Sequence, residues 1–266
     1  IQEIKALTKK PFGINIIVQK ANKYQQDQVD IALEEGTPLI ITSLGNPKHI
    51  IKRAHETGTK VYCDVVGMEH AKKVADLGAD GIIAVGSGAG GHAGTISPFA
   101  LIPQLVEAVK IPVLAAGSIS DGRTMAAALS LGADGVYMGT RFIASKEAEV
   151  AEGYKNAIVK SNSEDIVNTE KVDGFPGNFI LNKTLKSIGL ETSVSEFIAS
   201  KSKKVKKWIS LSRAAKSLFG PEKSKVSYKT VYSAGHGVGL IDEVMPVKEI
   251  MGSMVKEYEA IRKQLP

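Results

Sequence analysis

The residues with the clearest chemical potential lie in a glycine-rich segment, residues 86–94 (GSGAGGHAG), which directly follows the apolar run 81–85. Glycine lets the backbone approach a ligand closely and adopt positive φ, at an entropic cost. The segment holds one imidazole, His92, a group that can exchange a proton near neutral pH. We therefore predict that His92 is catalytic, with a purely structural histidine as the alternative. Ser87 of the same segment is expected in the substrate pocket.

A second glycine-rich segment, residues 233–239 (SAGHGVG), contains His236, which we also expect in the substrate pocket. The sequence has no paired-cysteine motif, no HExxH motif and no carboxylates clustered at expected strand ends, so no metal site is predicted. It also has no GxSxG motif between a strand and a helix, which a serine hydrolase elbow requires. An organic cofactor suits these residues better.

Two pairs of a glycine and a hydroxyl residue, Gly117 with Ser118 and Gly139 with Thr140, follow the last two expected strands. Each pair offers backbone N–H groups and a hydroxyl, and a helix expected directly after the first pair would point its positive end at it. Barrel enzymes often hold phosphate after their final strands. We therefore predict a phosphate site made mostly by the backbone, with ordinary turn chemistry as the alternative.

The elements that must position these groups follow a repeated pattern, in which a mixed polar and apolar segment ends at a glycine and an apolar run follows. The letters LGADG occur twice, at residues 77–81 and 131–135. A helix that ends at glycine and leads directly into a strand explains the pattern. We expect strands over residues 11–18, 38–42, 60–66, 82–85, 111–116 and 136–138, and helices over residues 1–7, 25–35, 47–57, 69–77, 98–110 and 121–131.

The nearly continuous apolar runs are typical of parallel strands buried on both faces. Strands that alternate with helices predict an α/β fold, a TIM (β/α)8-type barrel whose first two β/α units are missing from this chain, with an open doubly wound sheet as the alternative. We expect barrel units (strands 3 to 8) over residues 1–147, a helical or loop insert or lid over 148–235, and a C-terminal segment over 236–266 that packs back on the barrel as a helical elaboration. Further helices are expected over residues 148–160 and 246–263, and a helical layer with the lysine-rich segment 201–207 and Trp208.

The composition is typical of a globular protein and gives no sign of a nucleic-acid or membrane partner. The chain has 266 residues, of which 43% are hydrophobic and 23% charged, as in an ordinary globular protein. Its net charge of +6 comes mainly from lysines that are not interleaved with aromatics, so no nucleic-acid partner is predicted. No apolar stretch approaches the ~18 residues of a membrane span, so no membrane partner is predicted either. The single cysteine, Cys63, is expected to be buried and inert, which fits a cytoplasmic protein.

Four stretches together resemble the nitronate monooxygenase family, formerly called 2-nitropropane dioxygenases: residues 11–16 (PFGINI), 89–94 (AGGHAG), 111–142 (IPVLAAGSISDGRTMAAALSLGADGVYMGTRF) and 234–242 (AGHGVGLID). The related FMN-dependent enoyl-ACP reductases share much of this pattern. The resemblance implies a TIM barrel that binds FMN, with His92 as a base or hydrogen-bonding group beside the flavin. It places the FMN phosphate on Gly117, Ser118, Gly139 and Thr140, and the flavin near Asn15, Gly90 and Gly91.

The same resemblance implies a reaction, the oxidation of alkyl nitronates or nitroalkanes by O2 with electron transfer to FMN. The implied partners are a small-molecule substrate and O2, and a homodimer is left open. Two alternatives stay open as well. One is an FMN-dependent enoyl-ACP reductase that uses NAD(P)H, and the other is a non-catalytic barrel that binds a flavin or another phosphate ligand.

Overall fold

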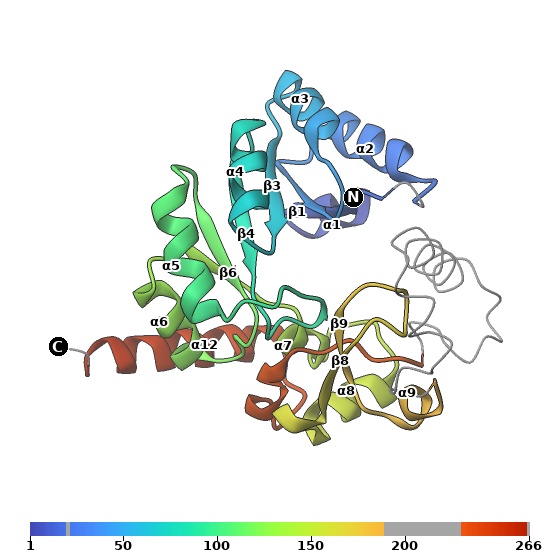
Figure 1. Ribbon diagram of the computed structural model, residues 1–266, viewed down its shortest axis with the longest axis vertical. Helices are drawn as coiled ribbons and strands as arrows, with labels where there is room; N and C mark the ends of the chain where they lie inside the picture. Colours follow the sequence, from blue (N-terminus) through green and yellow to red (C-terminus); the bar gives the residue numbers. More distant parts are fainter. Residues whose placement is uncertain (20–21, 189–229, 265–266) are drawn as a thin grey trace, which may run out of the picture. The chain divides into compact units, whose positions relative to one another are not determined.

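The computed structural model describes residues 1–19, 22–188 and 230–264, and Figure 1 shows their helices and strands. The contacts within the chain divide it into two compact units. Unit 1 comprises Ile1–Val85, Ile96–Ala115 and Ala128–Val136, and unit 2 comprises Gly86–Thr95, Ala116–Ala127 and Tyr137–Pro266. Each unit is therefore assembled from segments that lie far apart in the sequence.

A six-stranded sheet contains β1 (Gly13–Ile17), β2 (Leu39–Ser43), β3 (Lys60–Val65), β4 (Gly81–Val85), β6 (Val113–Ala116) and β7 (Gly135–Tyr137). All six expected strands are confirmed, with small shifts at their ends. The strands neighbour one another in chain order, and the pairs from β1 to β4 are parallel. A doubly wound sheet reverses its strand order at a switch point, whereas barrel units do not. The fold is thus α/β of the TIM-barrel type, and the doubly wound alternative is wrong.

Helices occupy the connections between these strands, as crossovers between parallel strands require. The helices before β7 are α1 (Gln2–Leu7), α2 (Gln25–Glu34), α3 (Lys48–Glu56), α4 (Met68–Asp76), α5 (Pro98–Ala108) and α6 (Gly122–Ser130). Each one confirms a helix expected from the sequence. That two further barrel units are missing from the chain stays a prediction.

The two LGADG repeats fold in the same way. Gly78 and Gly132 have φ angles of 89° and 96°, the left-handed conformation that ends a helix. Two residues after each glycine, an aspartate binds the adjacent strand. Oδ2 of Asp80 accepts the backbone N–H of Val61 at 2.8 Å, and Oδ2 of Asp134 accepts that of the first residue of β6 at 2.8 Å. The LGADG sequence therefore forms a helix-to-strand connection, in which the glycine ends the helix and the aspartate hydrogen-bonds to a neighbouring strand.

Burial differs between the strands. β4 is buried on both faces over its first four residues, as expected for a parallel strand. In β2 and β3, however, burial alternates, so the expectation of two buried faces is wrong there. One face carries Ile40, Val61 and Cys63, all buried. The opposite face carries half-buried side chains that include the polar Ser43 and Asp64, which an apolar core would not accept.

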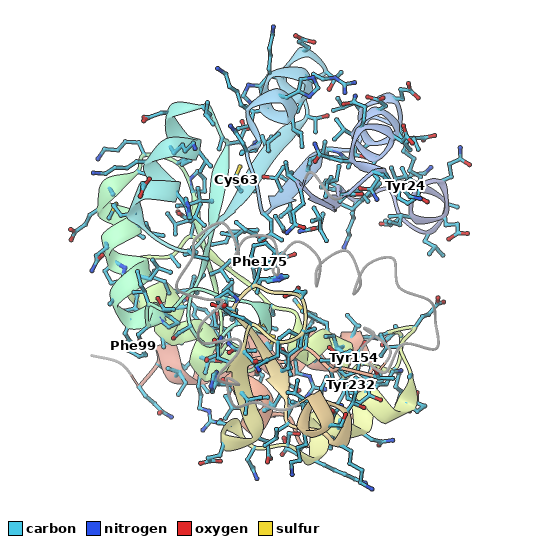
Figure 2. All side chains as sticks on the ribbon, turned by 45° about the vertical axis from the view of Figure 1, so that its right-hand side comes forward. Tyr24, Cys63, Phe99, Tyr154, Phe175 and Tyr232 are labelled. Carbon is cyan, nitrogen blue, oxygen red and sulfur yellow. The ribbon has the colours of Figure 1, made fainter. Side chains whose placement is uncertain are left out.

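Cys63 is buried, as predicted, and Figure 2 marks its position on the sheet. The hydroxyl of Thr42 donates a hydrogen bond to its sulfur at 3.2 Å. Burial raises the pKa of the Cys63 thiol to about 11, so the thiol stays protonated at neutral pH. Because the thiolate is the reactive form, this cysteine is inert.

Unit 2 contains a small antiparallel sheet that the sequence does not predict. Its order is β5 (Gly91–His92), β9 (Gly177–Ile180) and β8 (Ile166–Thr169). The other described elements of the unit are α7 (Thr140–Ile143), α8 (Glu152–Lys160), η1 (Ser163–Asp165), α9 (Lys183–Ile188), η2 (His236–Leu240) and α12 (Val247–Arg262). β8 and β9 have four residues each, too few to give a clear period in the sequence.

The core of unit 2 joins its separate segments through apolar side chains. The buried members of this cluster are Ala144, Ile158, Ile166, Ile180, Ala234, Val238 and Ile241. Beside them the rings of Tyr154 and Tyr232 stack with centroids 4.5 Å apart (Figure 2). α12 buries Ile250 and Met254. The helices expected over residues 148–160 and 246–263 are confirmed as α8 and α12.

The expected domain boundaries at residues 147 and 235 stay predictions, as does the role of residues 148–235 as a lid. The lysine-rich segment 201–207 and Trp208 lie outside the described residues. Among the residues that the structure describes, no helix combines the length and apolarity needed to cross a membrane.

Candidate functional site

Three consecutive backbone carbonyls of the glycine-rich segment 86–94 accept hydrogen bonds from other segments of the chain. Those of Ser87 and Ala89 accept hydrogen bonds from Nδ2 of Asn178, at 2.8 and 2.7 Å. The carbonyl between them accepts the backbone N–H groups of Ser118 and His236, at 3.2 and 3.1 Å. Asn178 lies on β9 and is 1% exposed, so its amide is fully committed to this junction. Segments that are distant in the sequence therefore converge on residues 87–89.

Several glycines here are required by chain packing rather than by a ligand. A Cβ atom on Gly88 would lie 1.8 Å from the hydroxyl oxygen of Ser118, and one on Gly90 would lie 2.8 Å from the backbone N of Gly235. Gly91 differs, because a Cβ there would meet nothing closer than 3.8 Å. Its φ of 68° is what favours glycine at this position. The roles of Gly90 and Gly91 at a cofactor stay predictions.

His92 lies on β5, paired with Gly177 of β9, and its side chain is 35% exposed. Its Nε2 lies 2.7 Å from Oδ2 of Asp173, whose side chain is 17% exposed. Nε2 is buried, and this contact is an ion-pair approach without the alignment of a hydrogen bond. Phe175, labelled in Figure 2, meets the imidazole edge to face, with ring centroids 5.7 Å apart. The sequence points to His92 but not to Asp173, because only the pairing of β5 with β9 brings their segments together.

Gly117 and Ser118 form a turn directly after β6, with φ angles of 110° and 58°. A positive φ is uncommon for serine and costs energy, and such positions cluster at functional sites. The N–H of Ser118 donates to the carbonyl of Gly88, so this amide is not free for a phosphate. The predicted role of this turn in phosphate binding therefore depends on its other polar groups, the N–H of Gly117 and the hydroxyl of Ser118.

Gly139 and Thr140 lie at the start of α7, where the first backbone N–H groups have no acceptor within the helix. A Cβ atom on Gly139 would meet no atom within 4 Å, so there is open space beside this glycine. Oγ1 of Thr140 accepts the N–H of Gly235 at 3.1 Å. The neighbouring Arg141 is 5% exposed, and its Nη2 donates to two backbone carbonyls, at 2.8 and 2.7 Å. Its Nη2 is therefore committed to the chain, whereas its Nε is buried and has no hydrogen-bond partner among the described residues.

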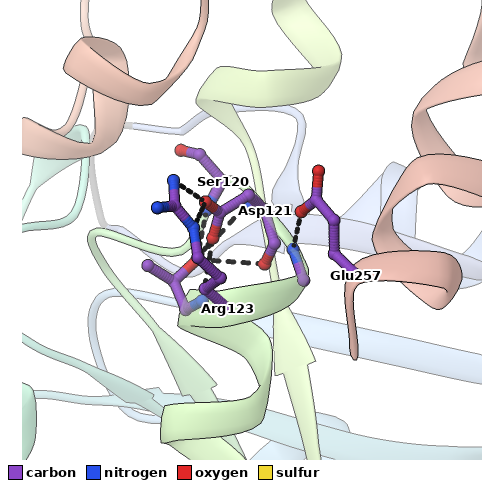
Figure 3. Close-up of polar contacts among 6 residues, drawn as sticks. Ser120, Asp121, Arg123 and Glu257 are labelled. Atoms are coloured by element: carbon purple, nitrogen blue, oxygen red, sulfur yellow. Dashed lines mark hydrogen bonds and ion pairs between the residues drawn. The ribbon is translucent and has the colours of Figure 1, made fainter. Parts of the chain in front are cut away.

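Carboxylates close the N-terminus of α6 (Figure 3). Oε2 of Glu257, from α12, accepts the N–H of Gly122 at 2.8 Å, and Oδ1 of Asp121 accepts that of Thr124 at 2.8 Å. Burial alone would raise the pKa of Asp121, but hydrogen bonds from Thr124 and Arg123 lower it overall, so this carboxyl is ionised at neutral pH. Two of the first N–H groups of α6 therefore already have carboxylate acceptors, and a contribution of this helix end to phosphate binding stays a prediction.

His236 begins η2, and its backbone carbonyl accepts the hydroxyl of Ser163 at 2.8 Å. Nδ1 of its ring is buried, with no hydrogen-bond partner among the described residues. A buried polar atom without a partner needs an explanation, and a ligand or a water molecule can supply one. The places of His236 and Ser87 in a substrate pocket stay predictions.

Unit 1 carries a short chain of polar side chains at the ends of its strands. Nδ2 of Asn15 donates to Oγ of Ser43 at 2.8 Å, and this hydroxyl donates to Oδ2 of Asp64 at 2.6 Å. The other carboxyl oxygen of Asp64 is buried and has no partner among the described residues. Burial raises the pKa of Asp64 to about 6. Of the three, only Asn15 is an expected site residue. The sequence could have indicated Ser43 and Asp64 only through their positions at the ends of strands.

The expected site residues fall in both units. Unit 2 holds Ser87, Gly90, Gly91, His92, Gly117, Ser118, Gly139, Thr140 and His236, whereas unit 1 holds Asn15. Among the described residues, no group of three or more histidine, cysteine or acidic side chains is placed to hold a metal ion. Within unit 2, the hydrogen bonds that meet at residues 87–89 link the segments of His92, Ser118 and His236 directly.

The family model described as nitronate monooxygenase matches residues 1–257. A Rhodococcus jostii protein named (3aS,4S,5R,7aS)-5-hydroxy-7a-methyl-1-oxo-octahydro-1H-indene-4-carboxyl-CoA dehydrogenase is 30% identical, over 97% of this chain and 80% of its own length. A probable nitronate monooxygenase of Staphylococcus saprophyticus is 36% identical, over 66% of this chain and 53% of its own length. The chain thus spans about half of this second relative.

Among solved structures, FabK from Thermotoga maritima is similar, with a TM-score of 0.82 and 34% identity over 99% of this chain and 80% of that one. This likeness extends over the whole described fold, and the family match extends over nearly the whole sequence. The matched range of the family model includes the motifs around His92 and at residues 111–142. The chain belongs to the nitronate monooxygenase family and is an oxidoreductase of this flavin-dependent type.

Proposed function

We propose that this chain is an FMN-dependent oxidoreductase that oxidises alkyl nitronates, or nitroalkanes, with O2. The observation that carries the proposal is the imidazole of His92, about one-third exposed and fixed on β5 beside the carboxylate of Asp173. An imidazole so placed can take a proton from the carbon next to a nitro group, or hold a nitronate anion by a hydrogen bond. Membership of the family supports the class of reaction.

The start of α7 fits the phosphate of FMN. There is open space beside Gly139, and the first backbone N–H groups of this single turn have no acceptor within it. The proposed cofactor ligands are Asn15, Gly90, Gly91, Gly117, Ser118, Gly139 and Thr140. When bound, FMN supplies the electron acceptor that no side chain of the protein can supply.

The proton step is assigned to His92. When a ring nitrogen takes the proton, the C–H bond beside the nitro group breaks and an N–H bond forms, while the electron pair spreads onto the nitro oxygens and gives the nitronate. A substrate supplied as the nitronate has already lost this proton. The two forms of one substrate therefore separate a role of His92 as a base from a role in binding.

A second candidate function is the reduction of an enoyl-ACP by NAD(P)H. The observation that favours it is the similarity to FabK at 34% identity. The two candidates differ in what reduces the flavin. Rapid reduction by NADH or NADPH would favour the second, whereas reduction by a nitronate alone would favour the first.

The test uses the intact protein and begins with its absorption spectrum. We expect a yellow protein that retains FMN and consumes O2 with a nitronate. His92→Ala should lower kcat on a nitroalkane by about 100-fold or more, and lower it far less on the preformed nitronate, because general base catalysis contributes that much. The control is His70→Ala, an exposed histidine on α4, which should leave both rates unchanged. A colourless protein that takes up no FMN would rule out the proposed function.

A further inference from the structure

We propose that Asp173 is the positioning residue of His92, holding the ring so that Nε2 carries the proton and Nδ1 is the nitrogen that meets the reactant. The inference deepens the proposed function and rests on it for the reaction at Nδ1. The arrangement of the two side chains, however, is a property of unit 2 alone and can be measured without any substrate.

The first observation is that the two carboxyl oxygens of Asp173 have different partners. Oδ1 accepts the backbone N–H of Phe175 at 3.1 Å, which fixes the carboxyl group within its own turn. Oδ2 then lies 2.7 Å from Nε2 of His92. Since Asp173 is only 17% exposed at its side chain, this charge acts on the imidazole with little screening by water. The carboxylate therefore favours a proton on Nε2.

The second observation is which part of the ring remains accessible. Nε2 is buried, although the side chain as a whole is 35% exposed. Nδ1 is not among the buried polar atoms that lack a partner, and the described residues supply it with no hydrogen bond. The exposed part of the imidazole therefore includes Nδ1 and excludes Nε2. Within the described part of the chain, Nδ1 is therefore the ring nitrogen open to a reactant.

The third observation is that the ring is constrained on other sides. The backbone of His92 is fixed by pairing with Gly177, and the ring of Phe175 packs against the imidazole with an interplanar angle of 80°. Asp173 and Phe175 belong to one turn, so the same turn supplies the charge and the packing surface. A group held in one orientation in this way needs no reorganisation before it reacts.

The chemical consequence concerns the state of His92 before and after proton transfer. With the proton on Nε2, Nδ1 has a free lone pair and can accept the proton from the carbon beside the nitro group. The ring then becomes an imidazolium with both nitrogens protonated, and the carboxylate next to Nε2 stabilises this positive charge. Asp173 itself neither gains nor loses a proton.

Asp173→Asn gives a sharp test because Oδ1 is already held by the N–H of Phe175. The amide NH2 must then take the place of Oδ2 beside Nε2, where its N–H groups disfavour a proton on Nε2, which moves the ring proton onto Nδ1. We expect 15N spectra of the histidine rings to show a proton on Nε2 in the wild type and on Nδ1 in the variant. His92→Gln, which removes the His92 signals, identifies them among the five histidines of the chain. In activity, kcat on a nitroalkane should fall by about 100-fold or more, and by much less on the nitronate, since the reacting nitrogen is blocked.

The matched control is Asp165→Asn, in the same part of the chain. Oδ2 of Asp165 accepts the N–H of Asn162 at 2.8 Å, and the amide oxygen of asparagine can accept the same N–H, so the variant removes one carboxylate charge without touching His92. It should leave the His92 spectrum and the ratio of the two rates unchanged. If Asp173→Asn does not fold, the wild-type spectrum still decides the point, and Asp173→Ala provides a second variant.

A wild-type ring with its proton on Nδ1, or an unchanged His92 spectrum in Asp173→Asn, would overturn the inference. Absence of nitronate oxidation in a wild type that has the expected ring spectrum would instead remove the proposed function and leave the role of Asp173 intact. The two failures are therefore distinguishable.

Discussion

Asp64 is a single residue whose ionisation should make the stability of the protein depend on pH. Burial raises its pKa to about 6 from the ordinary value of 3.8, against the lowering effect of the hydrogen bond from Ser43. A raised pKa means that the folded state binds this proton more tightly than the unfolded chain does. The stability that Asp64 contributes is thus complete below about pH 4 and is lost as the pH rises through about 6.

The expected result is a change in the free energy of unfolding relative to Asp64→Asn, which has no such ionisation. Between about pH 4 and pH 7, the wild type should lose on the order of 2–3 kcal/mol relative to this variant. Urea unfolding of both proteins at several pH values measures the difference. Ser43→Ala is the control, because loss of its hydrogen bond should move the loss of stability to higher pH. Parallel pH curves for wild type and Asp64→Asn would contradict the assignment.

Single residues also show what the sequence can and cannot reveal about the site. His92 could be predicted because an imidazole among glycines after a buried strand is unusual within one local window. Asp173 could not, because nothing local distinguishes it from other acidic residues. The partner of a side chain depends on strand pairing over long distances, and one sequence does not record this pairing directly.

At the scale of elements, α6 and α12 meet closely at Gly122. A Cβ atom there would lie 2.4 Å from the carbonyl oxygen of Met254 and 2.6 Å from the backbone N of Tyr258, so the two helices would have to separate. The N–H of the same glycine binds Glu257. We expect Gly122→Ala to destabilise the protein by about 2 kcal/mol or more, because backbone atoms cannot give way as a flexible side chain can.

Gly252→Ala is the matched control within α12. A Cβ atom at Gly252 would meet no atom within 4 Å, so alanine adds helix propensity without a clash. This variant should stabilise the protein by about 0.5–1 kcal/mol. Thermal and urea unfolding of the two variants measure both effects. Equal effects of the two substitutions would show that the helices do not meet closely at Gly122.

The elements that could be predicted are those with a local signature. The glycine that ends a helix and the apolar run that follows predict four of the six strands, and the other two, over residues 11–18 and 111–116, are apolar runs without such a glycine. By contrast, β5 has two residues, and it pairs with β9 about 85 positions later. Such a short strand exists only through its partner, so propensity and period could not reveal it.

At the scale of the whole molecule, the two units differ in how their contacts are spread along the chain. Strands β1 to β4 of unit 1 pair with neighbours in sequence. Unit 2 depends on long-range bonds, from Asn178 to Ser87 and from Gly122 to Glu257. Distant contacts of this kind require long loops to close, which explains why the sequence described unit 1 better than unit 2.

Asn178→Asp tests whether unit 2 can open locally while unit 1 stays folded. An aspartate has no N–H group, so its carboxylate would face the carbonyl oxygens of Ser87 and Ala89, and both would lose their donor in a buried place. We expect hydrogen exchange of the backbone N–H groups of Ser118 and His236 to accelerate by about 10- to 100-fold, since an unsatisfied buried group costs about 1–3 kcal/mol.

The exchange of Val61 N–H, bound to Asp80 in unit 1, should stay unchanged in the same sample, because none of its partners depends on Asn178. Asn168→Ala is the control variant. Asn168 is exposed and donates to Oδ1 of Asn178, so alanine removes this hydrogen bond but keeps both bonds from Nδ2. Local opening of unit 2 predicts faster exchange at Ser118 and His236 alone. Equal acceleration at Val61 would mean that the amides open only through global unfolding, and the two units would then be a single cooperative structure despite their separate contacts.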